Sequence, residues 1–232
     1  MIEYLSWDSE FFSRKIGKIE LSNTSADLSE DLKRGKSEGY DLLYAFSNVG
    51  IDLAKCVNLV TEATLADRKV VYEISLNNKN FESKGLGGVE LTELSSELEN
   101  LAYESGKYSR FFLDKRFAES DFHRLYFQWI KKSLSKELAD KVFVVENEGR
   151  VAGMVTLKLG KTAQIGLIAV DPNLQGKGFG KLLIQQCFYE STRANCELLV
   201  VPTQFGNKQA CQFYEKCGFS VQSITHIYHF WM

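Results

Sequence analysis

Residues 170–183 read Val-Asp-Pro-Asn-Leu-Gln-Gly-Lys-Gly-Phe-Gly-Lys-Leu-Leu, and no other part of the chain is as informative. The apolar run 165–170 precedes it and ends at Asp171-Pro172, and three alternate glycines follow. Glycine lets a backbone approach a ligand closely and adopt φ values that a Cβ forbids. Apolar residues then recur at helical spacing, at Phe179, Leu182, Leu183 and Cys187. The pattern predicts a strand, a glycine-rich turn and a helix.

The predicted turn suits phosphate binding, because N–H groups at the start of a helix lack intrahelical acceptors and the helix dipole attracts anions. Two common phosphate motifs do not fit it. Dinucleotide-binding turns space their glycines as G-x-G-x-x-G, whereas this chain has G-x-G-x-G. A P-loop needs one more residue than separates Gly176 from Gly180, and a Ser or Thr where Leu182 stands.

The remaining pattern, Gln175-x-x-Gly178-x-Gly180, resembles the Q/R-x-x-G-x-G/A motif of the GNAT acetyltransferases. The resemblance implies that turn amides hold the pyrophosphate of acetyl-coenzyme A (acetyl-CoA). An ordinary glycine-rich strand-to-helix turn is the alternative. The turn positions implied to bind are Gln175, Gly176, Lys177, Gly178, Phe179, Gly180 and Lys181. In the superfamily the preceding strand also pairs with the pantetheine arm, and one of its amides polarises the thioester carbonyl. These roles fall on Leu167, Ile168, Ala169 and Val170.

A second motif follows at 207–219, Asn-Lys-Gln-Ala-Cys-Gln-Phe-Tyr-Glu-Lys-Cys-Gly-Phe. It is similar to the superfamily's N-x-x-A-x-x-F-Y-x-x-x-G-F signature, and an amphipathic helix alone does not require this whole set. The resemblance implies coenzyme contacts from Asn207, Ala210 and Phe213, although Asn207 is equally suited to helix capping. It implies that Tyr214 is the general acid for the coenzyme sulfur. A core tyrosine with its hydroxyl bonded to backbone is the alternative.

The composition favours a cytoplasmic globular protein. The net charge is −2, and Lys and Arg are evenly spread, so nucleic-acid binding is not expected. The first residues lack the apolar segment of a secretion signal, and no apolar run approaches the roughly 18 residues of a membrane span. Five cysteines without C-x-x-C spacing indicate a reducing compartment, and three scattered histidines indicate no metal site.

Periodicity predicts an α/β fold in two domains, a small α/β domain at 1–106 and a second domain at 107–232. The second domain has the element order of a GNAT domain, so the resemblance implies a mixed central sheet flanked by helices. In the first domain we expect strands at 16–21, 40–46 and 70–76, helices at 26–36, 52–66 and 91–103, and a loop at 77–90. In the second we expect strands at 110–113, 142–146, 151–159, 165–170, 196–201 and 221–231, and helices at 121–138, from 179 and from 208.

No general base is visible in the sequence. Many GNAT enzymes carry a glutamate on the central strand, but this chain has Gln164 and no acid between Lys161 and Val170. The candidates for the base are Glu146, Asp114 and Asp121, but the sequence does not show where their side chains lie relative to the site. A chain of water molecules serves equally well if the substrate amine is partly neutral at cellular pH.

The opening Trp7-Asp8-Ser9-x-Phe11-Phe12, with the strand that follows it, resembles the bacterial TDP-fucosamine N-acetyltransferases. The segments Ser109-Arg110-Phe111 and Leu125-Tyr126-x-x-Trp129-Ile130 resemble the same family. This implies acetylation of an amine on a TDP-linked amino-deoxy-sugar. Arg110 is then expected to meet the diphosphate, and Phe111 and Tyr126 to stack on the base or sugar. Core packing is the alternative for Tyr126.

Three other interpretations stay open. The chain is a GNAT enzyme for a different amine, such as a polyamine, an amino acid or a protein N-terminus, or it is a non-catalytic acyl-CoA sensor. The first half is also compatible with a degenerate copy of the same fold, and a homodimer is possible.

Overall fold

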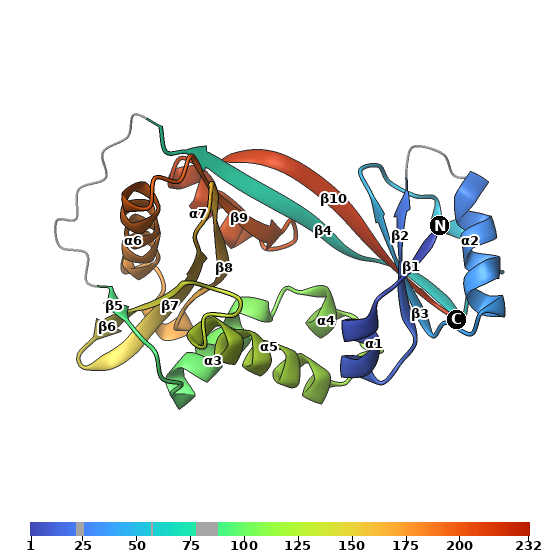
Figure 1. Cartoon of the computed structure of the whole chain (residues 1–232), viewed down its shortest axis with the longest axis horizontal. Helices are drawn as coiled ribbons and strands as arrows, with labels where there is room; N and C mark the ends of the chain where they lie inside the picture. Colours follow the sequence, from blue (N-terminus) through green and yellow to red (C-terminus); the bar gives the residue numbers. More distant parts are fainter. Residues whose placement is uncertain (22–25, 57, 78–87) are drawn as a thin grey trace. The chain divides into compact units, whose positions relative to one another are not determined.

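The computed structural model describes residues 1–21, 26–56, 58–77 and 88–232, which form two compact units (Figure 1). The first unit contains residues 1–70, 204–206 and 223–232, and the second contains 71–203 and 207–222. Strands β4 (Glu62–Ser75) and β10 (Ser220–Trp231) therefore contribute residues to both units. The predicted domain boundary at residue 106 stays a prediction.

The first unit is built on a parallel strand pair. β2 runs parallel to β3, and β1 and β10 flank this pair in antiparallel orientation. Its elements are β1 (Ile2–Tyr4), α1 (Ser6–Phe12), β2 (Ile16–Leu21), α2 (Ala26–Ser37), β3 (Leu42–Ser47) and the 3-10 helix η1 (Leu53–Lys55). The predicted strands 16–21 and 40–46 and helix 26–36 are confirmed within two residues.

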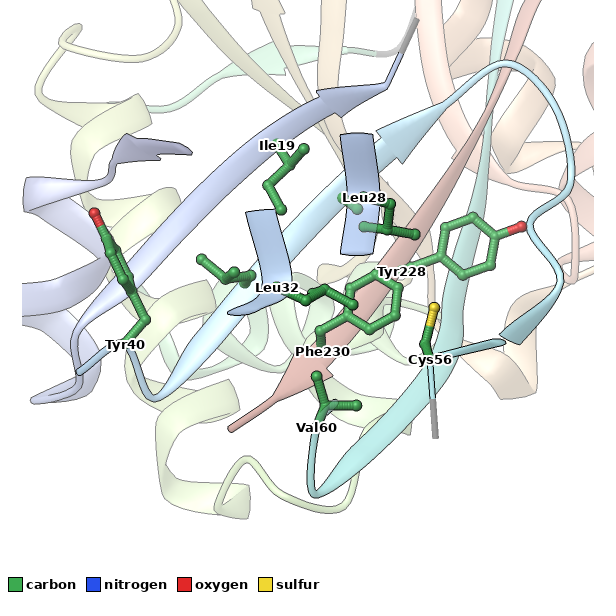
Figure 2. Close-up of a cluster of buried hydrophobic side chains, with 10 residues drawn as sticks. Ile19, Leu28, Leu32, Tyr40, Cys56, Val60, Tyr228 and Phe230 are labelled. Atoms are coloured by element: carbon green, nitrogen blue, oxygen red, sulfur yellow. The ribbon is translucent and has the colours of Figure 1, made fainter. Parts of the chain in front are cut away.

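The core of this unit lies between α2 and the sheet. Figure 2 shows Leu28 and Leu32 of α2 directed toward Ile19 of β2 and Phe230 of β10, and all four are buried. Tyr228 joins them because alternate residues of a strand share one face. Each such fully buried side chain contributes about 1.5–3 kcal/mol of transfer free energy.

The second unit is a mixed sheet with the strand order β10-β4-β9-β8-β7-β6-β5. Its strands after β4 are β5 (Val89–Glu90), β6 (Lys141–Asn147), β7 (Arg150–Lys158), β8 (Thr162–Val170) and β9 (Leu198–Gln204). Its helices are α3 (Ser96–Gly106), α4 (Arg110–Leu113), α5 (Glu119–Leu134), the 3-10 helix η2 (Pro172–Leu174), α6 (Phe179–Arg193) and α7 (Lys208–Lys216).

Helices cover both faces of this sheet. Six consecutive residues of β7, Ala152–Leu157, are buried, which requires cover on both sides because neighbouring side chains point in opposite directions. α3 packs on β7, β8 and α5, and α6 packs on β6, β7 and β8. The turn between β6 and β7 has positive φ at Glu148 and Gly149, which matches a type I′ hairpin. The predicted fold class, a mixed sheet flanked by helices, is confirmed.

Two predicted elements are wrong. Of the predicted helix 52–66, Leu53–Lys55 form the short η1 and the residues from Glu62 onward belong to β4. Asp52 caps a single 3-10 turn, and the β-branched residues that follow favour a strand. Residues 110–113 form α4, in which the N–H groups of Phe112 and Leu113 donate to the Ser109 carbonyl. A four-residue apolar run does not separate strand from helix by periodicity. Most of the predicted loop 77–90 lies outside the described residues.

Candidate functional site

The site begins where β8 separates from β9. Within the described chain, their parallel pairing joins Thr162–Gln164 to Leu198–Val200 and goes no further. On its other edge β8 stays paired with β7, although the register shifts between Val155 and Leu157. The Thr156 hydroxyl accepts the Leu167 N–H at 2.8 Å in this irregular region. The last residues of β8 therefore present a main-chain edge that β9 leaves unpaired.

The turn after β8 contains two glycines in the left-handed region. Asp171 accepts the Asn173 N–H at 2.8 Å and caps η2. Gly176 and Gly178 then have φ of 79° and 93°, values that L-residues rarely adopt. A Cβ built on either glycine meets no described atom within 4 Å. The space that a side chain at either position would occupy is therefore open.

The N-terminus of α6 starts at this open turn. Gly178 is its N-cap residue, and no described side chain caps the helix. The N–H groups of the first turn of an α-helix have no intrahelical acceptor and carry the positive end of the dipole. The arrangement has the geometry of an anion site made of backbone donors.

Contacts with α7 hold the turn in place. A Cβ on Gly180 would lie 3.2 Å from the Phe213 ring, so this glycine allows α6 to pack closely on α7. The Gln209 side chain donates to Gln175 Oε1 at 3.0 Å, and Gln175 Nε2 donates to the Val170 carbonyl at 3.2 Å. The end of β8, the turn and the first turn of α7 are linked by these bonds.

A cavity of about 290 Å³ lies against the turn, the end of β8, α7 and the end of α3. Most of the residues predicted to bind the coenzyme line it: Ile168, Ala169, Val170, Gln175, Gly176, Gly178, Phe179, Gly180, Lys181, Asn207, Ala210 and Phe213. Leu167 and Lys177 are not among the lining residues. Leu167 is buried and its N–H is bound to Thr156.

Tyr214 lines the same cavity and is only 3% exposed. Burial, followed by the nearby thiols of Cys187, Cys211 and Cys217, raises the pKa of its phenol well above the ordinary value. The hydroxyl therefore stays protonated throughout the neutral range, as a proton donor must. Next to it, the Tyr72 ring lies 5.7 Å from the Tyr214 ring.

α7 is fixed at both ends. Asn207 accepts the Ala210 N–H at 3.1 Å, so its side-chain oxygen caps the helix as the capping interpretation expects. Near the other end, the Tyr72 hydroxyl donates to Glu215 Oε1 at 2.9 Å. Burial, then hydrogen bonds with Cys211 and Glu215, raise the pKa of Tyr72. The helix that carries Tyr214 is held by a cap and by a buried tyrosine.

The three residues predicted to contact substrate are not among the residues that line this cavity. Phe111 is 9% exposed and packs edge-on against Phe117, while the Arg110 guanidinium lies over the Phe111 ring. Tyr126 is 4% exposed and packs against Gly106. Their substrate roles stay predictions.

The base candidates Glu146, Asp114 and Asp121 also do not line the cavity. Glu146 is exposed on β6. The Asp114 carboxylate accepts the Arg116 N–H at 3.0 Å. The Asp121 carboxylate accepts the Ala118 N–H at 3.3 Å at the start of α5 and pairs with Arg124. The contacts of Asp114 and Asp121 stabilise the local structure of the segments in which these residues lie.

One wall of the cavity was missed by sequence reasoning. The last turn of α3 and the residues after it contribute Glu104, Ser105, Lys107 and Tyr108. The helix was predicted at 91–103, so these residues fell at the expected domain boundary and received no function. The sequence signal that could have included Glu104 and Ser105 in the helix is the continuation of the helical pattern to Gly106.

In the described part of the chain no group of three or more His, Cys, Asp or Glu side chains is placed to hold a metal ion. Among the described helices, none has the length and apolar character needed to cross a membrane.

Comparison with known proteins places this geometry in a family. A model of the acetyltransferase (GNAT) family matches residues 96–219, more than half of the 232 residues. The spore coat polysaccharide biosynthesis protein SpsD of Bacillus subtilis is 25% identical over 132 residues, which cover 56% of this chain and 45% of the relative. N-alpha-acetyltransferase 30 of Xenopus laevis is 32% identical over 62 residues, 27% of this chain and 23% of the relative.

The matches span less than half of the length of these curated relatives. Among solved structures, a functionally unknown conserved protein from Staphylococcus epidermidis has a TM-score of 0.68 at 18% identity, covering 98% of this chain and 89% of that chain. At this identity the likeness shows the fold. The family model and the fold agree with the two motifs and the divergent strands, and the chain belongs to the acetyltransferase (GNAT) family, whose members generally use acetyl-CoA.

Proposed function

We propose that this chain transfers the acetyl group of acetyl-CoA directly to a primary amine. The observation that carries the proposal is one cavity lined by the glycine turn, the unpaired end of β8 and Tyr214. Acetyl-CoA supplies an activated acetyl thioester together with a diphosphate that a helix N-terminus can bind. The uncapped N-terminus of α6 and the open space over Gly176 and Gly178 fit that diphosphate.

The residues divide the work by position. Backbone N–H groups from Gln175 to Gly180 hold the diphosphate, and Lys181 adds a positive charge at the cavity wall. The main chain of Ile168–Val170 pairs with the pantetheine arm, as an added strand does. One of its N–H groups polarises the thioester carbonyl, a contribution of a few kcal/mol. Asn207, Ala210 and Phe213 complete the coenzyme side of the cavity.

Tyr214 is the proposed general acid. Its raised pKa keeps the phenol protonated, and its place in the cavity brings that proton to the departing sulfur. Protonation of the sulfur prevents return of the thiolate to the acetyl group. The role needs no metal.

We propose a TDP-linked amino-deoxy-sugar as the acceptor. The resemblance of residues 7–12 and 109–130 to the TDP-fucosamine N-acetyltransferases supports it, and the match to a protein named for polysaccharide biosynthesis is compatible with it. In this proposal Arg110, Phe111 and Tyr126 contact the sugar nucleotide, which requires the two buried rings to become accessible when substrate binds.

A second candidate acceptor is a protein N-terminus. The match to N-alpha-acetyltransferase 30 favours it, although that match covers 62 residues. A non-catalytic acyl-CoA sensor is a third candidate, and Tyr214 in the cavity argues against it. A cytoplasmic location fits the five free cysteines, and a homodimer stays a prediction.

The test is release of coenzyme A thiol from acetyl-CoA with a panel of amines. The panel contains TDP-4-amino-4,6-dideoxygalactose and other TDP-linked amino sugars, spermidine, free amino acids and a peptide with a free N-terminus. We expect the highest kcat/KM with a TDP-linked amino sugar. Preference for the peptide would favour the second acceptor class, and saturable coenzyme binding without turnover on any amine would favour the sensor.

A further inference from the structure

The cavity contains one carboxylate among its described lining residues, that of Glu104. Glu104 lies in the last turn of α3, and its side chain is 20% exposed. Its Oε1 is paired with the ammonium of Lys107, three residues further along, which also lines the cavity. An anionic group therefore lines the same cavity as Tyr214.

Packing fixes the last turn of α3 beside the cavity. A Cβ on Gly106 would lie 2.2 Å from the buried Tyr126 ring, so the absence of a side chain lets α3 and α5 meet there. α3 also packs on β8, the strand whose end lines the cavity. The position of Glu104 is therefore set by the fold rather than by a loop.

The Lys107 ammonium also shows what this carboxylate can bind. A primary amine at neutral pH has the same charge and the same three donors as a lysine side chain. Such a substrate ammonium is able to take the place of Lys107 at the Glu104 carboxylate. Lys107 lies within 5.9 Å of the Tyr108 ring centre, which offers it an alternative contact.

We propose that Glu104 binds the ammonium of the acceptor and is the general base of the reaction. This inference rests on the proposed function. Glu104 takes one proton from the ammonium and later releases it to solvent. The freed nitrogen lone pair forms the bond to the acetyl carbon as the carbon–sulfur bond breaks. The departing thiolate takes the Tyr214 proton, and the second proton of the nitrogen restores the phenol, so that the products are an amide, a thiol and one proton.

The experiment compares two nucleophiles in the full chain with Glu104→Gln. The first is the alkyl amine of the panel that the wild-type chain acetylates fastest, and the second is hydroxylamine, which is already neutral at pH 7. With the alkyl amine at pH 7 we expect kcat/KM to fall about 10²-fold or more, because general acid–base catalysis contributes this much. With hydroxylamine we expect little change. The loss with the alkyl amine should shrink as pH rises and the amine loses its proton without help.

The matched control is Glu97→Gln, an identical change at an exposed position of the same helix that does not line the cavity. It should leave both rates unchanged. Thermal unfolding of each variant reports folding, and Lys107→Met is a second probe. Since Lys107 competes with the substrate ammonium in this proposal, its removal should lower the KM for the alkyl amine.

Equal losses with both nucleophiles in Glu104→Gln, or a loss that does not depend on pH, would overturn the base role and leave the proposed transferase intact. Unchanged kcat/KM with the alkyl amine would do the same. If the wild-type chain transfers acetyl to neither nucleophile, the proposed function fails and the role of Glu104 fails with it.

Discussion

Two walls of the cavity are built from different parts of the chain. The turn wall, residues 170–181, offers backbone N–H groups, two glycines with positive φ and an uncapped helix end. The α3 wall, residues 104–108, offers side chains: a carboxylate, an ammonium and a phenol. Backbone donors suit a ligand common to a whole family, since they do not depend on side-chain identity. Side chains suit the partner that differs from one enzyme to the next.

The largest effect is expected for Tyr214, which lies on α7 and lines the same cavity as both walls. Tyr214→Phe should lower kcat about 10²–10⁴-fold and leave the KM for acetyl-CoA almost unchanged, because the phenol acts on the departing sulfur. Steady-state thiol release measures both constants. Tyr40→Phe is the matched control, since it removes a buried phenol that does not line the cavity. Near-normal turnover in Tyr214→Phe would remove this residue from the acid role.

The next prediction breaks the turn wall alone. Gly178→Ala puts a Cβ into the open space of the turn and strains a backbone with φ of 93°. We expect the KM for acetyl-CoA to rise about tenfold or more, which corresponds to about 1.4 kcal/mol or more of lost binding. The KM for the amine should change much less. Initial rates at varied concentrations of each substrate separate the two.

Gly149→Ala is the control for backbone strain. Gly149 has φ of 75° in the β6–β7 turn, and its Cβ also meets no described atom within 4 Å. Its substitution should cost a similar free energy of unfolding, about 1–2 kcal/mol, without affecting either KM. If both variants raise the KM for acetyl-CoA equally, strain accounts for the effect and the turn wall has no special role.

A third change disturbs the α3 wall through its packing. Gly106→Ala should lower the free energy of unfolding by about 1–3 kcal/mol, because the new methyl group overlaps the buried Tyr126 ring. It should raise the KM for the amine more than that for acetyl-CoA. Urea unfolding of Gly106→Ala, Tyr126→Leu and the double variant checks the cause. Strictly additive losses would show that the ring is not responsible.

The smallest expected effect is on the free energy of unfolding at high pH, through a hydrogen bond within α3. The Tyr103 hydroxyl donates to Glu99 Oε1 at 2.5 Å, and burial, then this hydrogen bond, raise the pKa of Tyr103 to about 12. The folded state therefore holds the phenolic proton more tightly than the unfolded state, whose pKa is about 10. The contribution to stability is complete below pH 10 and is lost as pH rises toward 12.

Tyr103→Phe should therefore flatten the decline of unfolding free energy between about pH 10 and 12, measured by urea unfolding at several pH values. Kinetic constants at pH 7 should stay near those of the wild-type chain, because Tyr103 does not line the cavity. An unchanged slope would show that the phenol titrates alike in the folded and unfolded states.

The turn wall was predictable from sequence because its geometry is local. Positive φ favours glycine, the helix start follows at once, and Gly180 has to face Phe213 for α6 to pack on α7. These geometric requirements determine the residue types at short spacings, so the sequence motif is enough to predict the turn. Even so, Leu167 was assigned to the site although its N–H is bound to Thr156 across the sheet. That contact depends on a register shift that no local pattern shows.

The α3 wall was not predictable, because it is made by tertiary packing. Glu104 and Lys107 look like the exposed charges of any helix end, and only the meeting of Gly106 with Tyr126 and of α3 with β8 brings them to the cavity. The same limitation explains the wrong helix at 52–66. Its apolar spacing allowed a helix, whereas pairing within the sheet made β4.

The most direct test of the central claim is calorimetric titration of the full chain with acetyl-CoA and with S-acetylpantetheine, which lacks the diphosphate. If the turn wall grips the diphosphate, acetyl-CoA should bind saturably at one site per chain, and S-acetylpantetheine should bind at least about tenfold more weakly, a difference of about 1.4 kcal/mol. Equal affinities, or no heat with acetyl-CoA, would contradict the account.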